Sequence, residues 1–161
     1  MKKKEPEILD FAKKYRGDRL DDCDRGLKDA EAQLAALEKR LREVGGLNDG
    51  LEEAVKGAVI DPKDTDRVAL AKRILGETGK CGEEMGAMKK QKNDIRKIFN
   101  GIKENLRAKN ASDVTAAEIA DLMKDIDKCN AKVKGYLGDL DRIEDKLKKL
   151  RGEWDAANNA A

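Results

Sequence analysis

The stretch that decides the fold is IADLMKDIDKCNAKVKGYLGDLDRIEDKLKKLRGEW, at residues 119–154. Its apolar side chains recur at alternating intervals of three and four residues. They are Ile119, Leu122, Ile126, Cys129, Val133, Tyr136, Leu140, Ile143, Leu147, Leu150 and Trp154. A repeat averaging about 3.5 residues places all of these side chains along one seam of an α-helix. The stretch therefore predicts one long amphipathic helix.

Two earlier stretches show the same spacing. The first carries Leu20, Cys23, Leu27, Ala30, Leu34, Leu37, Leu41 and Val44. The second carries Ala71, Ile74, Thr78, Cys81, Met85, Met88, Lys92, Ile95, Phe99, Ile102 and Leu106, with Lys92 as its one charged interruption. Short connections between long helices favour antiparallel neighbours. The sequence thus predicts an all-α fold, an elongated antiparallel three-helix coiled coil or bundle formed by a helical hairpin and a third long helix.

Glycine, proline and capping residues predict where these helices begin and end. The first helix is expected at about 17–59, with a kink or short break at 45–50, where Gly45-Gly46 precedes a cap-like pair, Asp49 and Glu52. The second is expected at 62–109, because Asp61-Pro62 can cap and open a helix.

The third helix is expected at 115–156. Thr115 and Glu118 have the spacing of a capping box, and Ser112 and Asp113 are alternative caps just upstream. The domain organisation that follows is an N-terminal tail at 1–16 and a three-helix rod at 17–161.

The composition argues against catalytic chemistry. Of the 161 residues, 42% are charged and 3% aromatic, and none is histidine, the commonest general base and a common metal ligand. We therefore expect no enzyme activity, no catalytic residues, no cofactor and no metal site. Three cysteines, an odd number, together with a start that does not resemble a signal peptide, indicate a reducing, cytoplasmic location.

The net charge of +2 hides an uneven distribution along the chain. Residues 17–60 carry −4, residues 61–110 carry +5 and residues 111–161 carry −2, and the tail adds +3. A basic middle helix between two acidic ones favours this pairing over others. Because exposed ion pairs contribute only about 0–1 kcal/mol each, their expected role is helix register rather than stability.

Three sets of residues are candidate interaction sites. A basic face on the middle helix comprises Lys89, Lys90, Lys92, Arg96 and Lys97. It is either an anion-binding surface for nucleic acid or phospholipid, or a solvated face that complements the acidic helices. Stacking aromatics do not interleave with these cations, which weighs against single-stranded nucleic acid.

The second set is in the N-terminal tail, where Ile8, Leu9, Phe11 and Tyr15 accompany a group of lysines. The tail is either frayed or docked, or it is a basic amphipathic segment that binds a membrane surface or a partner.

The third set is a stripe of glycines, Gly79, Gly82 and Gly86. Each costs about 1 kcal/mol relative to alanine within a helix. The stripe allows close approach of the third helix or a neighbouring subunit, or it provides a hinge, or it is merely tolerated.

The layout is a basic amphipathic start, a long helical hairpin and a further long helix. It is similar to that of the ESCRT-III and phage-shock-protein membrane remodellers, and to membrane-bending and spectrin-like three-helix rods. The segment Asp64–Arg73, rich in alternating charge and alanine, lies where such hairpins turn. No motif is specific enough to carry residue roles across, so the resemblance is one of layout.

These patterns favour a function in binding other molecules over a function in catalysis. We expect a non-catalytic structural or adaptor subunit that binds copies of itself or another helical protein. The resemblance and the basic tail imply an alternative, a protein that binds or remodels membranes. Nucleic-acid binding through the basic face is a weaker alternative.

Overall fold

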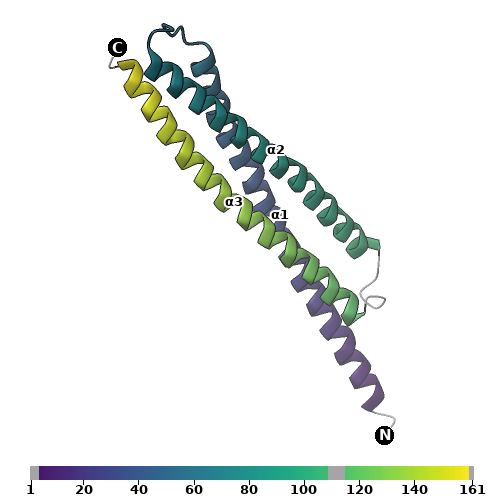
Figure 1. Ribbon diagram of the computed structural model, residues 1–161. Helices are drawn as coiled ribbons and strands as arrows, with labels where there is room; N and C mark the ends of the chain where they lie inside the picture. Colours follow the sequence, from purple (N-terminus) through teal and green to yellow (C-terminus); the bar gives the residue numbers. More distant parts are fainter. Residues whose placement is uncertain (1–3, 109–114, 160–161) are drawn as a thin grey trace. The chain divides into compact units, whose positions relative to one another are not determined.

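The computed structural model describes residues 4–108 and 115–159, and the side chains of residues 19–107 and 115–159. The described chain forms three α-helices: α1 (Lys4–Lys56), α2 (Thr65–Ala108) and α3 (Ala116–Asn159), seen in Figure 1. No strand occurs within the described residues. The all-α class predicted from the sequence is confirmed.

The chain divides into two compact units, and each helix contributes to both of them. Unit 1 comprises residues 1–35 and 92–134, and unit 2 comprises residues 36–91 and 135–161. Each unit is thus assembled from segments of α1, α2 and α3, and each is described by itself below.

The seams predicted from the sequence form the cores of the units. In unit 1 the buried apolar side chains are Cys23, Leu27, Ala30, Leu34, Ile95, Phe99, Ile102, Ile119, Ile126, Cys129 and Val133. In unit 2 they are Leu37, Leu41, Val44, Leu51, Val55, Ala71, Ile74, Cys81, Met85, Met88, Leu140, Ile143, Leu147, Leu150 and Trp154. The 3-4 spacing therefore identified the buried faces of all three helices.

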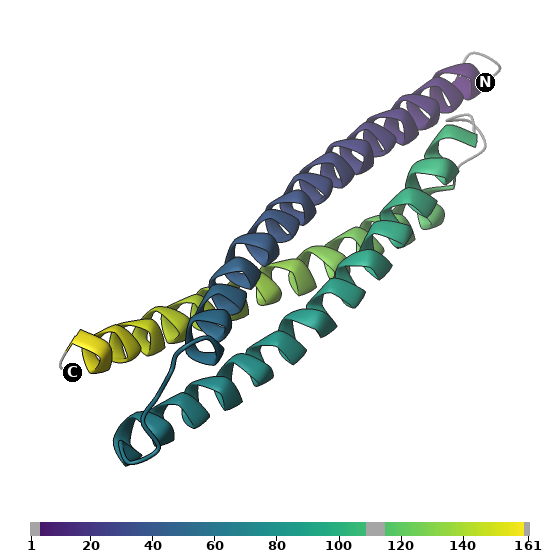
Figure 2. The same cartoon turned by 90° about the horizontal axis from the view of Figure 1, so that it is seen from above.

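Helix α1 differs from the expected first helix at both ends and in the middle. It begins at Lys4 rather than near residue 17, and it ends at Lys56 rather than near residue 59. It is helical throughout 45–50, so the short break is absent (Figures 1 and 2), and the alternative, a kink at 45–50, stays a prediction. Two glycines cost a helix only about 2 kcal/mol. The seam continues past them, because Val44 and Leu51 are both buried, and this burial outweighs the glycine penalty.

The second helix begins three residues later than the sequence suggested. The Asp61 carboxylate accepts a hydrogen bond from the Lys63 amide at 3.0 Å, and the Asp61 carbonyl accepts one from Asp64 N at 2.9 Å. Asp61 and Pro62 therefore form a turn, with proline in the position where its fixed φ is favoured. Asp64 is the actual cap, since its Oδ1 accepts a hydrogen bond from Arg67 N at 3.2 Å.

The cap of the third helix lies where the sequence placed it. Thr115 Oγ1 accepts a hydrogen bond from Glu118 N at 3.1 Å, and the Thr115 carbonyl accepts one from Ile119 N at 3.1 Å. This is the N-cap arrangement expected for Thr115. The alternative caps, Ser112 and Asp113, lie outside the described residues.

Candidate functional site

Arg40 is at the centre of a group of polar contacts between helices in unit 2. Its guanidinium on α1 donates to Glu144 and Asp141 of α3, each at 2.8 Å, and to Glu43 of its own helix at 3.3 Å. Hydrogen bonding to Arg40 is the largest cause of a lowered pKa at the Glu144 carboxyl, with Lys148 adding to the effect. Arg40 therefore links α1 to α3 through charge-assisted hydrogen bonds.

Removing Arg40 is expected to weaken the acid sensitivity of the fold. The pKa of Glu144 is lower in the folded chain than its ordinary value of about 4.3. The unfolded chain thus takes up more protons as the pH falls below that value, and the free energy of unfolding declines. In Arg40→Gln, urea unfolding followed from about pH 5 to pH 3 should show a shallower decline. Arg25→Gln, which removes a pair within α1 alone, is the control. An identical decline in Arg40→Gln and wild type would refute this role.

Ion pairs between α2 and α3 do not follow the net charges of the helices. Arg73 of α2 pairs with Glu153 of α3, but Arg142 and Lys146 of α3 pair with acids of α2, Glu84 at 2.8 Å and Glu77 respectively. In unit 1, Lys103 of α2 binds Glu31 of α1 at 2.9 Å. The segment charges of −4, +5 and −2 predict ion pairs in which α2 supplies the cation and α3 supplies the acid. Of the three α2–α3 ion pairs described here for unit 2, only Arg73–Glu153 has this polarity, and the other two have the opposite one. Individual neighbours across a seam decide the pairs.

A polar contact interrupts the apolar core of unit 2. Asn48 falls in the α1 seam between Val44 and Leu51 and is only 3% exposed. Its Nδ2 donates to the Thr78 carbonyl of α2 at 3.1 Å, while its Oδ1 is buried with no hydrogen-bond partner. Asn48 was not among the predicted seam residues, which ended at Val44, but it lies four residues further on, where the 3-4 spacing continues. A buried asparagine in such a seam fixes helix register at a cost in stability.

Replacing Asn48 by leucine is expected to stabilise unit 2. The change removes an unsatisfied buried carbonyl, whose desolvation costs about 1–3 kcal/mol, and the Thr78 carbonyl retains its place in the α2 hydrogen-bond ladder. The free energy of unfolding, measured with urea, should rise by about 1–3 kcal/mol. Asn48→Ala, which removes the same amide but leaves a cavity, should gain less. Destabilisation by Asn48→Leu would show that the amide is fully satisfied in solution.

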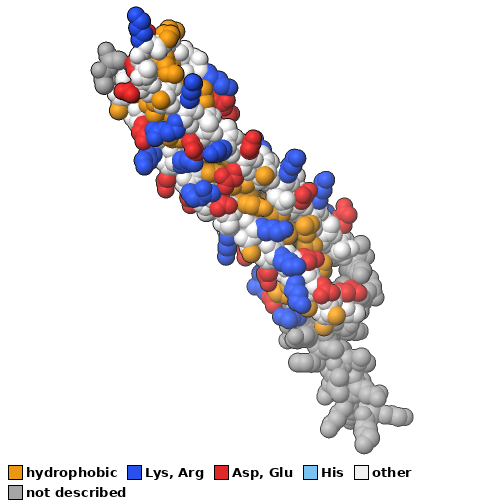
Figure 3. Space-filling model, in the orientation of Figure 1, with side chains coloured by type: hydrophobic (Ala, Val, Ile, Leu, Met, Phe, Trp, Pro, Cys, Tyr) orange, Lys and Arg blue, Asp and Glu red, His pale blue; other side chains and the backbone are white. Residues whose placement is uncertain are grey.

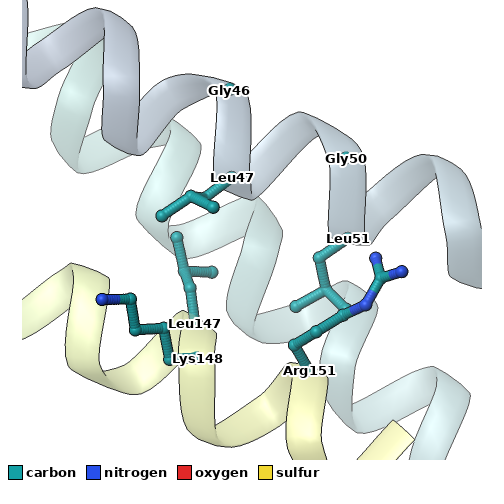
Figure 4. Close-up of a pocket in the computed structure, with 7 residues that line it drawn as sticks. All are labelled: Gly46, Leu47, Gly50, Leu51, Leu147, Lys148 and Arg151. Carbon is teal, nitrogen blue, oxygen red and sulfur yellow. The ribbon is translucent and has the colours of Figure 1, made fainter. Parts of the chain in front are cut away.

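A hollow of about 270 Å³ lies between α1 and α3 of unit 2. Figure 4 shows Leu47 of α1 and Leu147 of α3 pointing toward one another, with Arg151 of α3 extending beside Leu51. Gly46, Gly50 and Lys148 complete the lining. We call this hollow the α1–α3 groove. Sequence reasoning missed it, because Leu47 falls outside the seam and reads as an isolated apolar residue.

The candidate basic face divides between the two units. Lys89 and Lys90 are exposed residues of α2 in unit 2, whereas Lys92, Arg96 and Lys97 belong to the α2 segment of unit 1. Lys92 is partly buried at its seam position. Figure 3 shows cationic and acidic side chains intermingled over the visible face, with apolar side chains between them. Anion binding by the basic face remains a prediction.

The other two candidate sets have different positions. Residues 8–15 lie within α1, but the side chains of Ile8, Leu9, Phe11 and Tyr15 lie outside the described residues. Gly79, Gly82 and Gly86 are exposed on α2 in unit 2. A Cβ atom at Gly82 would meet Asn48 Nδ2 at 3.6 Å, and at the other two it would meet nothing within 4 Å. The third helix therefore does not pack closely on this stripe, and contact with another subunit stays a prediction.

The three cysteines are seam residues rather than reactive groups. Cys23, Cys81 and Cys129 are free and buried, and burial is the main cause of a raised pKa at each thiol. Since the thiolate is the nucleophile and the metal ligand, burial keeps these side chains in their less reactive form. Among the described residues, no three cysteine or carboxylate side chains are grouped to hold a metal ion.

Comparison with known proteins gives no relative from which a role can be transferred. No protein-family model, curated protein or solved structure matches the chain. Within the part of the chain that the structure describes, no helix is both long and apolar enough to cross a membrane.

Proposed function

We propose that this chain is a non-catalytic structural or adaptor subunit, which binds further copies of itself or a helical partner through the outer faces of its helices. The observation that carries the proposal is helix length. The helices have 53, 44 and 44 residues, whereas the mean helix of a globular protein has about 11–12. Each buries one seam and leaves its remaining surface, many turns long, for contact with other molecules.

The contacts in unit 2 support an antiparallel three-helix coiled coil as the scaffold for this role. On α2, residues 73, 77 and 84 pair with residues 153, 146 and 142 of α3, so the numbers run in opposite directions. Residues 47 and 51 of α1 line the same hollow as residues 147 and 151 of α3, which fits α1 and α3 running the same way. An up-down-up path is the arrangement we propose.

Sedimentation velocity combined with circular dichroism tests the scaffold. We expect a spectrum dominated by α-helix and a frictional ratio well above that of a compact sphere, as the elongated form predicted from the sequence requires. A strongly helical spectrum with the frictional ratio of a compact monomer would refute the elongated form. Loss of helical signal in dilute solution would refute the scaffold itself.

One observation favours the membrane-surface alternative. Helix α1 begins at Lys4, so the basic segment with Ile8, Phe11 and Tyr15 belongs to a helix, the conformation that an amphipathic membrane-binding segment requires. Flotation with anionic vesicles should then recover the full chain but not a chain that lacks residues 1–16. Equal recovery of the two chains would exclude a role for this segment.

A further inference from the structure

Two polar residues meet in the otherwise apolar core of unit 2. Among the described residues, Asn48 of α1 and Thr78 of α2 are the buried polar side chains, 3% and 1% exposed. The Thr78 hydroxyl bonds within its own helix, to the Leu75 carbonyl at 3.2 Å. Asn48 therefore depends on the Thr78 backbone carbonyl, which accepts a hydrogen bond from its Nδ2 at 3.1 Å. Because Oδ1 has no partner, this bond is the one that holds the buried amide.

Gly82 leaves the Thr78 carbonyl open to Asn48. In a helix, each side chain lies over the turn on the N-terminal side of its own Cα. Gly82 is four residues after Thr78, so no side chain lies over this carbonyl. A Cβ atom at Gly82 would lie 3.6 Å from Asn48 Nδ2, so the amide occupies the space beside the glycine. A side chain longer than alanine at this position would compete with the amide for that space.

The alignments one heptad away lack such an opening. Because the seam repeats every seven residues, sliding α1 along α2 by one heptad would again bury apolar side chains. Asn48 would then face Ala71 or Met85. Four residues after these come Leu75 and Lys89, whose long side chains cover the corresponding carbonyls. The amide would stay buried without its hydrogen bond, which lowers the population of that alignment by about fivefold or more.

We infer that Asn48 and Gly82 form a register lock, which selects one alignment of α1 with α2 among those that the apolar seam permits. Asn48 supplies the donor, and Gly82 uncovers the acceptor. The lock gives Gly82 a role that Gly79 and Gly86, the other glycines of the stripe, do not share. The inference rests on the antiparallel scaffold of the proposed function, because it names the contact that aligns two of its helices.

The distance between spin labels on α1 and α2, measured by double electron–electron resonance, reports the alignment. Lys39 and Lys72 are exposed residues of unit 2, so Lys39→Cys with Lys72→Cys carries the labels in the full chain. They lie nine and six residues from Asn48 and Thr78, on opposite sides of that contact, and so about 22 Å apart along antiparallel helices. A slip of one heptad changes this separation by about 10 Å. The native cysteines are buried and should take up little label.

Moving the glycine by one heptad is the sharpest variant. Gly82→Lys combined with Lys89→Gly keeps the composition, covers the present acceptor and opens the Met85 carbonyl instead. Asn48 should follow the glycine. The two labels should then move apart by about 10 Å, because α1 slides toward the C-terminal end of α2.

The matched control exchanges the same residue types beside the lock. Gly86→Lys combined with Lys90→Gly should keep the reference distance, since both residues are exposed and a Cβ atom at Gly86 would meet nothing within 4 Å. Asn48→Leu removes the donor, so a second distance about 10 Å from the first should appear. An unchanged distance in the Gly82→Lys, Lys89→Gly variant, or an equal change in the control, would overturn the lock.

The outcomes separate this inference from the proposed function. If the labelled reference chain has a helical spectrum but no single defined distance, the antiparallel scaffold is overturned together with the lock. If the reference distance is single and Asn48→Leu leaves it single, the lock alone is overturned. Asn48→Leu is expected to stabilise unit 2, so it decides the question even if the glycine exchange weakens folding. Circular dichroism on each labelled variant shows whether the helices are retained.

Discussion

Replacing Gly101, Gly135, Gly138 and Gly152 together by alanine is expected to stabilise the protein by about 4 kcal/mol. All four lie within helices, and a Cβ atom at each would meet nothing within 4 Å. Each alanine should gain about 1 kcal/mol, because glycine has greater backbone freedom to lose on folding. For a chain of this size, the midpoint of thermal unfolding should rise by about 8–16 °C.

Thermal unfolding followed by circular dichroism measures this gain, and Gly57 provides the control. A Cβ atom at Gly57 would lie 3.1 Å from the Glu53 carbonyl oxygen, just past the end of α1. Gly57→Ala should therefore gain little or lose stability. If the four-site variant unfolds no higher than wild type, these positions are not continuous helix in solution.

Replacing Phe99 by alanine is expected to cost about 3–5 kcal/mol of folding free energy. Phe99 is 1% exposed and is among the largest fully buried side chains, in the α2 seam within unit 1. Truncation loses the transfer free energy of the ring and leaves a cavity that the three helix segments can only partly close.

The adjacent residue is the control for this substitution. Ile98 is 43% exposed, so Ile98→Ala should change the free energy of unfolding by no more than about 0.5 kcal/mol. Urea unfolding of the two variants compares consecutive residues of one helix. Similar losses at the two positions would contradict the seam assignment on which the fold rests.

The repetitive part of the fold was predictable because it depends on local spacing. Burial of Leu34, Ile95, Val133 and Leu147 follows from the 3-4 repeat, and the Thr115 cap follows from its side chain and position. Helix ends and breaks were less predictable, because the free-energy contributions that compete at these positions are small. At Gly45-Gly46, burial of the seam outweighed the glycine penalty. At Asp61, the side chain expected to cap a helix accepts a hydrogen bond within a turn instead.

The candidate site depends on contacts that the sequence pattern does not reveal. The α1–α3 groove is lined by residues about 100 positions apart in the sequence, such as Leu47 and Leu51 of α1 and Leu147 and Arg151 of α3. Only the alignment of α1 with α3 shows this. The net charges of the segments likewise do not predict the ion pairs between Arg40 and α3, since the segments that contain α1 and α3 are both net acidic. Asn48 was not predicted either, because it is polar and lies beyond Val44, the last residue of the predicted first seam.

The central claim, that the chain associates through its helix faces, is tested most directly by light scattering during size-exclusion chromatography. A single chain has a mass of 17.8 kDa. We expect a weight-average mass that exceeds this value and rises with loading concentration. A mass of one chain at every concentration would contradict self-association.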